Sequence, residues 1–277
     1  MNYSRVVQEA IEIHRVSPVD VLGLGDATGE YAYLNSQRES YIRTVNDVDS
    51  LYKSDRSSTR ILEIGSFLGT VSISLKTLGY RVSACDIPEF HESPSLRTLY
   101  EEHGIPFDGL NLRHAQLPYE SNSFDVVIAC EVVEHLNFNP LPVLKEINRV
   151  LRENGLLYVA MPNQVRVVNR MKLFFGKSIH NQIEDFFKQL DRHDNMIVGL
   201  HWREYALSET VQMVEAMGFE TIRKYYFTGG ADTRASTLKR GLRELLYSYP
   251  PFRPSQVVIG RKVAVPSYDF WLTDANS

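Results

Sequence analysis

From Arg60 to Met161, short apolar runs alternate with stretches of helical periodicity, and this alternation limits the fold more than any other feature of the sequence. A run of strand length, then a helical pattern, then another run is typical of βαβ units, whose strands are parallel. The pattern predicts strands at residues 60–65, 80–86, 110–115, 124–130 and 155–161, with a helix at 143–151 before the last. Two later runs, at 219–227 and 256–263, complete the prediction: an α/β, Rossmann-like, seven-stranded mixed sheet with helices on both faces.

Two stretches lie outside this minimal sheet. Residues 1–57 have helical periodicity without a strand signal, which predicts an N-terminal helical extension to a domain at residues 58–277. Residues 162–200 follow the fifth expected strand, so we expect a lid-like insertion after strand five, although added core packing is an equal reading. The glycines at 23–29 predict a turn cluster and not a phosphate loop, because no apolar helix follows them.

Composition restricts the class of protein. No apolar run approaches the roughly 20 residues needed to span a bilayer, and Glu9 and Glu12 interrupt any export signal, so we expect a soluble, cytoplasmic protein. Cys85 and Cys130 lie in apolar runs and are expected to be small core residues. The net charge is −4, yet residues 223–262 hold nine Lys or Arg against two acids. Such a stretch is usually a solvated surface, and the alternative is contact with phosphate or an anionic membrane. An amphipathic helix at 237–246 is expected to pack on the domain rather than on a lipid.

The segment that indicates the chemistry is ILEIGSFLGTVSISLKTLGYRVSACDI, residues 61–87. Gly65 allows a tight turn and the close approach of a ligand, and Gly69 lets the following helix begin close to the sheet. Seventeen residues later, Asp86 closes the second strand, where a carboxylate can accept both hydroxyls of a ribose. This spacing predicts a nucleoside cofactor.

The same segment resembles the first motif of the class I S-adenosylmethionine (SAM)-dependent methyltransferases, an acid followed by Gly-x-Gly-x-Gly, with Phe67 in place of the middle glycine. Residues 117–136, 148–163 and 201–220 are similar to later segments of that family, in the same order. The resemblance covers about residues 58–227, and it implies SAM as cofactor and S-adenosylhomocysteine as product. It also implies a cofactor site made of Glu63, Gly65, Ser66, Gly69, Asp86, Ile87, Gln116, Leu117 and Cys130.

Candidate catalytic residues follow the fourth expected strand. The resemblance places Glu131 near the transferred methyl group. An alcohol acceptor would need a general base, and His135 and His201 are the candidates, although His135 could equally pack on the adjacent helix. Glu131, Glu134 and His135 have helical spacing and, with His201 as a fourth ligand, could hold a divalent metal; the run resembles the metal-assisted O-methyltransferases of quinone biosynthesis and of small-RNA 3′ ends. We favour metal-free transfer, because Glu134 can also be a helix-start acid.

The expected function is therefore methyl transfer to a small-molecule or glycan acceptor, at oxygen. Two alternatives stay open: an RNA-directed, metal-assisted 2′-O-methyltransferase, and a SAM-binding protein without catalysis. The first would bind RNA along the aromatic residues Tyr225, Tyr226, Phe227, Tyr247 and Tyr249. The sequence predicts neither the acceptor's identity nor the oligomeric state.

Overall fold

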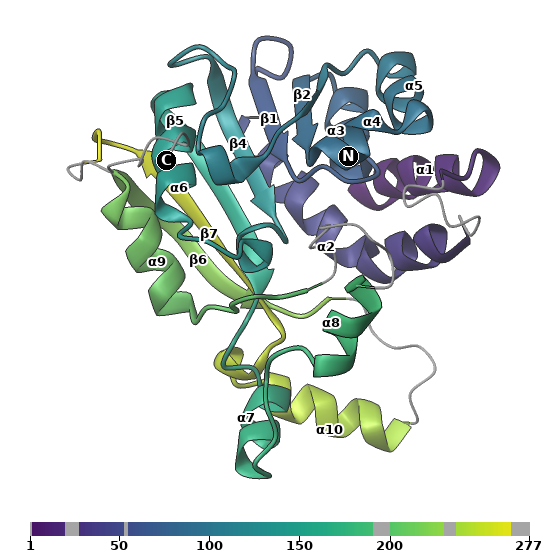
Figure 1. The fold of residues 1–277 in the computed structure, drawn as a ribbon, viewed down its shortest axis with the longest axis vertical. Helices are drawn as coiled ribbons and strands as arrows, with labels where there is room; N and C mark the ends of the chain where they lie inside the picture. Colours follow the sequence, from purple (N-terminus) through teal and green to yellow (C-terminus); the bar gives the residue numbers. More distant parts are fainter. Residues whose placement is uncertain (1, 20–27, 53–54, 191–199, 230–236, 267–277) are drawn as a thin grey trace.

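One seven-stranded sheet forms the centre of the computed structural model (Figure 1), with strand order β3-β2-β1-β4-β5-β7-β6. The structure describes residues 2–19, 28–52, 55–190, 200–229 and 237–266. The strands are β1 (Arg60–Ile64), β2 (Arg81–Asp86), β3 (Phe107–Gly109), β4 (Phe124–Cys130), β5 (Leu151–Pro162), β6 (Phe219–Phe227) and β7 (Ser255–Lys262).

The direction of the strands fixes where a ligand can bind. Strands β1 to β5 pair in parallel, whereas β7 is antiparallel to both β5 and β6. The strand order reverses between β1 and β4, and the carboxyl ends of strands at such a reversal border the ligand crevice of open α/β sheets. The mixed Rossmann-like sheet predicted from the sequence is confirmed.

The prediction of a third strand at 110–115 is wrong. The strand lies earlier, at Phe107–Gly109, and Leu112–His114 form a single 3-10 turn. Asn111 explains the difference, because its side chain accepts a hydrogen bond from the backbone N–H of Arg113 and its carbonyl accepts one from His114. An asparagine that caps a turn in this way competes with strand pairing.

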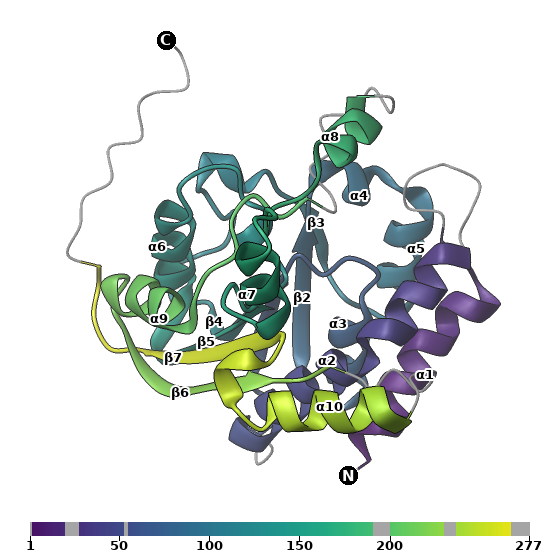
Figure 2. The ribbon, with the colours of Figure 1, turned by 90° about the horizontal axis from the view of Figure 1, so that it is seen from below.

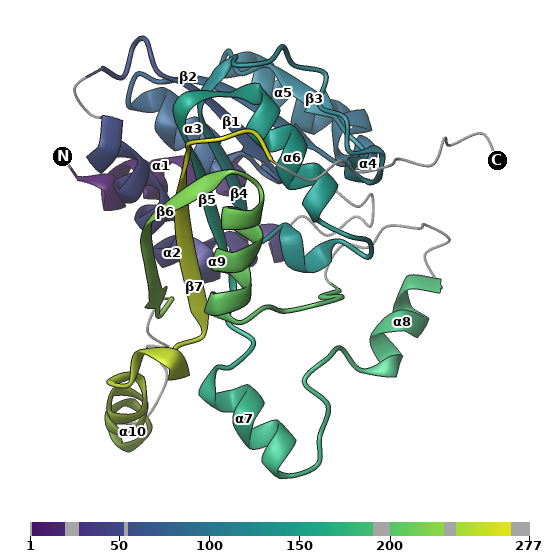
Figure 3. The ribbon, with the colours of Figure 1, turned by 90° about the vertical axis from the view of Figure 1, so that its left-hand side faces the viewer.

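Alternate side chains of each strand enter two separate cores, one on each face of the sheet. Ile61, Val126 and Tyr158 face the helices α1 to α5, whereas Leu62 and Val127 face the opposite side. The first face is covered by α1 (Tyr3–Val16), α2 (Thr28–Tyr52), α3 (Thr70–Thr77), α4 (Pro88–Glu92) and α5 (Pro94–Glu102). The second face is covered by α6 (Leu141–Val150) and α9 (Leu207–Ala216), as Figures 2 and 3 show.

The N-terminal helices pack tightly on the first face. Asp49 of α2 is fully buried and accepts hydrogen bonds from the hydroxyls of Tyr3 and Tyr80, both at 2.8 Å, and from Arg56 at 2.6 Å. These contacts join α1, α2 and the start of β2. The helical character expected for residues 1–57 is therefore confirmed in its described part, while most of the glycine cluster at 23–29 lies outside the described residues.

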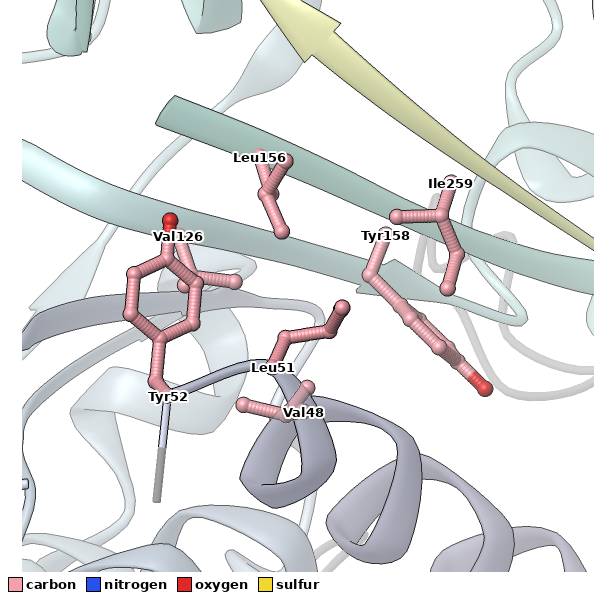
Figure 4. A pocket seen from close by; sticks show the side chains of 7 residues that line it. All are labelled: Val48, Leu51, Tyr52, Val126, Leu156, Tyr158 and Ile259. Atoms are coloured by element: carbon pink, nitrogen blue, oxygen red, sulfur yellow. The ribbon is translucent and has the colours of Figure 1, made fainter. Parts of the chain in front are cut away.

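A narrow crevice remains between α2 and the sheet (Figure 4). Only apolar groups and two tyrosines line it: Val48, Leu51, Tyr52, Val126, Leu156, Tyr158 and Ile259. Val126 lies in the amino-terminal half of β4. Leu156 lies at the amino-terminal end of the stretch of β5 that pairs continuously with β4. The crevice therefore lies away from the carboxyl ends of the strands and is a seam of helix packing.

Three helices project beyond the carboxyl ends of the parallel strands, as Figures 1 and 3 show: α7 (Val167–Phe174), α8 (Ile183–Leu190) and α10 (Thr237–Tyr247). The insertion expected at 162–200 thus contains two helices, although its residues 191–199 lie outside the described part, and its lid role stays a prediction. The amphipathic helix expected at 237–246 forms and packs against the 3-10 turn Pro250–Phe252, but Leu242 and Leu245 are exposed. Within the described ranges, no helix is long and apolar enough to cross a bilayer.

Candidate functional site

The turn after β1 needs glycine for two different reasons. Gly65 has a φ of 72°, and a Cβ atom there would lie 2.4 Å from Cγ2 of Val132, which follows β4. Gly69, with a φ of 73°, is the N-cap of α3. Phe67 lies between them and also has a positive φ, 47°. A non-glycine residue in this conformation is strained, and such strain is concentrated at ligand-binding sites.

Asp86 holds this turn in place. Its carboxylate accepts hydrogen bonds from the backbone N–H of Phe67 at 2.6 Å and from that of Ile87 at 2.7 Å. Burial raises the pKa of Asp86 to about 6. A carboxylate oxygen has more than one lone pair, so these bonds leave acceptor capacity for a ligand hydroxyl. The position predicted to bind a ribose therefore also fixes the glycine turn.

Glu63 and Ser66 are buried beneath the turn, and two partners that the sequence analysis did not identify hold them. Ser72 of α3 donates a hydrogen bond to Glu63, and burial raises the pKa of Glu63 to about 8. The Tyr100 hydroxyl donates to Ser66 Oγ at 2.7 Å. Ser72 is nine residues after Glu63 and Tyr100 comes from α5, so neither has a local signal. Glu63 supports the turn from below.

The remaining predicted cofactor residues lie around the same edge of the sheet. Ile87 is half-buried at the start of α4, and Gln116 is exposed. Leu117 is buried, and its backbone N–H donates to Glu146 at 3.0 Å. Cys130 ends β4 half-buried, with its sulfur 3.7 Å from Oγ1 of Thr44 in α2, whereas Cys85 is fully buried as expected.

The acidic run after β4 is not one helix, so the premise that its residues share a helix face is wrong. Glu131 has a φ of 54° and turns the chain, and only Val133–His135 form a 3-10 turn. The structure nevertheless brings Glu134 and His135 together with His201, which is distant in sequence. One ligand atom of each lies within 4.8 Å of the others. The three residues, here called the Glu–His–His cluster, could hold a metal ion; Glu131 is not one of them.

Each histidine of the cluster is oriented by a hydrogen bond from its Nδ1. His135 donates to the carbonyl of Leu200 at 2.8 Å, and His201 donates to Oε1 of Glu204 at 3.1 Å. With these bonds, the neutral form of each ring carries its lone pair on Nε2, and the ring centroids are 4.9 Å apart. A carbonyl or carboxylate behind each imidazole is the usual arrangement around metal-binding histidines.

Glu204 was missed in the sequence, although its spacing of three residues from His201 is a weak signal. It is 7% exposed and also accepts hydrogen bonds from Arg166 and from Asn169, both at 2.9 Å. Arg166 and Asn169 belong to the insertion, so Glu204 joins the insertion to the cluster.

The donor atoms of the cluster suit a cation. Glu134 is fully buried, and neither of its carboxyl oxygens has a hydrogen-bond donor among the described residues. Burial and the neighbouring carboxyl of Glu131 raise the pKa of Glu134, and burial raises that of Glu131 to about 7. Burial, aided by nearby His201, lowers the pKa of His135 to about 4. The neutral imidazole is a poor proton acceptor at pH 7, but it is the form that binds metal, and one carboxylate with two imidazoles is a donor set that divalent metals accept.

Comparisons with known proteins point to one family. Residues 62–159 match the family model described as a methyltransferase domain. A ubiquinone biosynthesis O-methyltransferase from Ruegeria sp. is 32% identical over 127 residues, which are 44% of this chain and 51% of that protein. An uncharacterised protein from Methanocaldococcus jannaschii is 34% identical over 89 residues, 32% of this chain and 35% of that protein. The chain thus aligns with about half or less of the length of these curated relatives.

Solved structures share the fold over a longer range. A SAM-dependent methyltransferase from Thermotoga maritima, described as a possible histamine N-methyltransferase, has a TM-score of 0.55 at 17% identity and covers 85% of this chain and 96% of its own. A SAM-dependent methyltransferase from Archaeoglobus fulgidus has a TM-score of 0.54 at 14% identity, over 84% of this chain and 100% of its own. At such identities the likeness concerns the fold alone.

Proposed function

We propose that this chain, a class I SAM-dependent methyltransferase by its domain and fold, transfers the methyl group of SAM to a small-molecule or glycan acceptor, at oxygen. The observation that carries the proposal is the turn after β1, where Gly65 has a positive φ and packs closely against Val132, and Asp86 at the end of the neighbouring strand holds the backbone of Phe67. SAM supplies an activated methyl group, so the protein mainly has to align the acceptor with it.

In this proposal, the residues of the turn bind the cofactor. The Asp86 carboxylate would accept the ribose hydroxyls, and Gly65 lets the turn after β1 lie close against Val132. Ile87, Gln116 and Leu117 would surround the adenine, and the edge at Cys130 and Glu131 would lie at the methyl end. Positions on two adjacent strand ends suit a ligand that crosses the reversal of strand order.

A small-molecule acceptor is favoured over RNA. The relative from Ruegeria sp. is described as a ubiquinone biosynthesis O-methyltransferase, which is consistent with a small acceptor. Part of the aromatic strip that an RNA ligand would need is unavailable, because Phe227 is buried and the hydroxyl of Tyr225 donates a hydrogen bond to Asp47, although Tyr249 is exposed. Thr44 beside Cys130, and the bonds from the insertion to Glu204, suggest that the helical extension and the insertion shape the acceptor side. The cytoplasmic location stays a prediction.

We further propose, against the preference drawn from the sequence, that the transfer is metal-assisted. Glu134, His135 and His201 would hold a divalent cation, which would lower the pKa of an acceptor hydroxyl. The fully buried carboxyl of Glu134, whose neighbouring side chain in the acidic run is that of Glu131, and the two oriented histidine rings support this role. His135 would then act as a ligand and not as the general base, because its pKa is lowered.

The test combines binding with labelling. Calorimetry should show that the protein binds SAM and S-adenosylhomocysteine. Incubation with methyl-labelled SAM and fractionated cell extract should label a small molecule, and a chelator should reduce the amount of label transferred. Labelled RNA would support the RNA-directed alternative, and SAM binding without any labelled product would support a non-catalytic protein. Failure to bind either cofactor form would contradict the whole proposal.

A further inference from the structure

The elements beyond the carboxyl edge carry most of the exposed large apolar side chains among the described residues. Phe174 is 83% exposed, Phe175 66% and Leu245 70%. Single exposed apolar residues are ordinary, but a group of them on neighbouring elements marks an interaction surface. We call this group the apolar platform: Met171, Leu173, Phe174, Phe175, Leu242 and Leu245.

The two helices of the platform are neighbours. Both α7 and α10 pack against the 3-10 turn Pro250–Phe252, and the guanidinium of Arg170 lies 5.4 Å from the centroid of the Phe252 ring. Both project from the same end of the molecule, as Figures 1 and 3 show. The platform is therefore one region of the surface, built from segments about 70 residues apart in the sequence.

Positive charge accompanies the platform in a protein whose net charge is −4. Residues 163–182 contain no Asp or Glu, and Lys177 is exposed while Lys172 is half-buried. On α10, Arg240 and Arg243 outnumber Glu244. Apolar side chains with basic neighbours are the features of helices that lie in the interface of an anionic membrane.

The charges also argue against self-association. A two-fold symmetric contact through the platform would place each residue against the same patch of a second copy. The basic residues around Lys172, Lys177 and Arg240 would then face one another without compensating acids on α7. A surface of negative charge fits this region better than a second copy of the chain.

We propose that the apolar platform docks the protein on a lipid surface that contains anionic headgroups. The phenylalanines enter the boundary between headgroups and acyl chains, and the neighbouring lysines and arginines contact the lipid phosphates. This docking turns the carboxyl edge of the sheet toward the lipid, and it does not depend on the proposed methyl transfer.

The experiment is co-sedimentation of the full chain with vesicles, without cofactor or acceptor. Binding is expected to vesicles of phosphatidylcholine mixed with phosphatidylglycerol, to be much weaker with phosphatidylcholine alone, and to decrease with salt. The double variant Phe174→Glu, Phe175→Glu should lower partitioning at least about tenfold. Lys172→Gln and Lys177→Gln should each lower it about fivefold.

The matched control is Val265→Glu, an equally exposed apolar residue at 77%, which follows the end of β7 at the opposite edge of the sheet. It should leave partitioning unchanged. Because Phe174 and Phe175 are solvent-exposed, their glutamate variants should melt at the wild-type temperature, so a loss of binding is not a loss of folding. Equal binding to neutral vesicles, binding to neither, or a dimer that the double variant dissociates would overturn the proposal.

Discussion

The glycine turn after β1 and the Glu–His–His cluster lie at the same edge of the sheet but are specified in different ways. The turn is local: Gly65, Phe67, Gly69 and Asp86 fall within 22 residues, and the backbone itself makes the site. The cluster joins His201 to Glu134 and His135 across 66 residues, and its geometry depends on side chains from the insertion. The comparison predicts that the two halves of the site can be lost separately.

The largest expected effect is a loss of SAM binding at the glycine turn, the cofactor half of the site. Gly65→Ala should lower SAM affinity by about a hundredfold or more, because the new Cβ would lie 2.4 Å from Val132 and the φ of 72° is strained for alanine. Calorimetry measures the loss, while divalent-cation binding should change little. Gly176→Ala is the matched control, since Gly176 also has a positive φ, 66°, but no atom within 4 Å of the new Cβ. Wild-type SAM affinity in Gly65→Ala would show that the turn does not receive the cofactor.

The next largest effect is a loss of cation binding at the Glu–His–His cluster, the metal half of the site. Glu134→Gln should lower Mn²⁺ affinity by about a hundredfold, because it removes the carboxyl group that would coordinate the cation while keeping the shape of the side chain. Electron paramagnetic resonance of added Mn²⁺ measures the change, and SAM affinity should stay within about twofold. Unaltered Mn²⁺ binding in this variant would contradict the ligand role. A parallel loss of SAM binding would contradict the independence of the two halves.

A smaller effect tests how the insertion positions His201. Glu204→Gln should lower Mn²⁺ affinity about tenfold, since loss of the carboxylate weakens the orientation of the imidazole without removing a ligand. Glu204→Asp should restore part of the affinity. Nitrogen-15 spectra of His201 distinguish this role from a merely structural one: the variant should populate the other tautomer. A single unchanged tautomer with weakened binding would argue against positioning.

The smallest effect is the dependence of cation binding on pH. The raised pKa values of Glu131, to about 7, and of Glu134 mean that protons compete with the cation below neutrality. Mn²⁺ affinity should therefore rise severalfold between pH 6 and 8, as protons leave these carboxyl groups. His135, with a pKa of about 4, is already neutral across that range and cannot cause the rise. Glu131→Gln should reduce the slope, and an affinity independent of pH would contradict the proton competition.

The sequence predicts the features that depend on residues close together in the chain. It predicts less well the features that bring distant residues together. Apolar runs and helical periodicity predict the sheet, because both are local patterns that burial enforces. The third strand fails because the Asn111 side chain bonds to the backbone and ends strand pairing, an interaction that hydrophobic spacing does not show. The cofactor turn was accessible from the sequence for the same local reason.

The cluster was predicted from its residue types but on a wrong geometric premise. Glu131 turns the chain with a φ of 54°, so helical spacing does not apply to the run. Asn169 could not be found from the sequence, because it reaches Glu204 only after the insertion folds onto the sheet, and Glu204 has only the weak signal of its spacing of three residues from His201. The exposure of Leu242 and Leu245 was also missed, since an amphipathic pattern specifies an apolar face but not what covers it.

The most direct test of the central claim is a crystal structure of the protein with S-adenosylhomocysteine. The account predicts the ribose hydroxyls on the Asp86 carboxylate and the homocysteine sulfur at the edge formed by Cys130 and Glu131, facing the Glu–His–His cluster. A ligand bound elsewhere, or a sulfur directed away from that edge, would contradict the account.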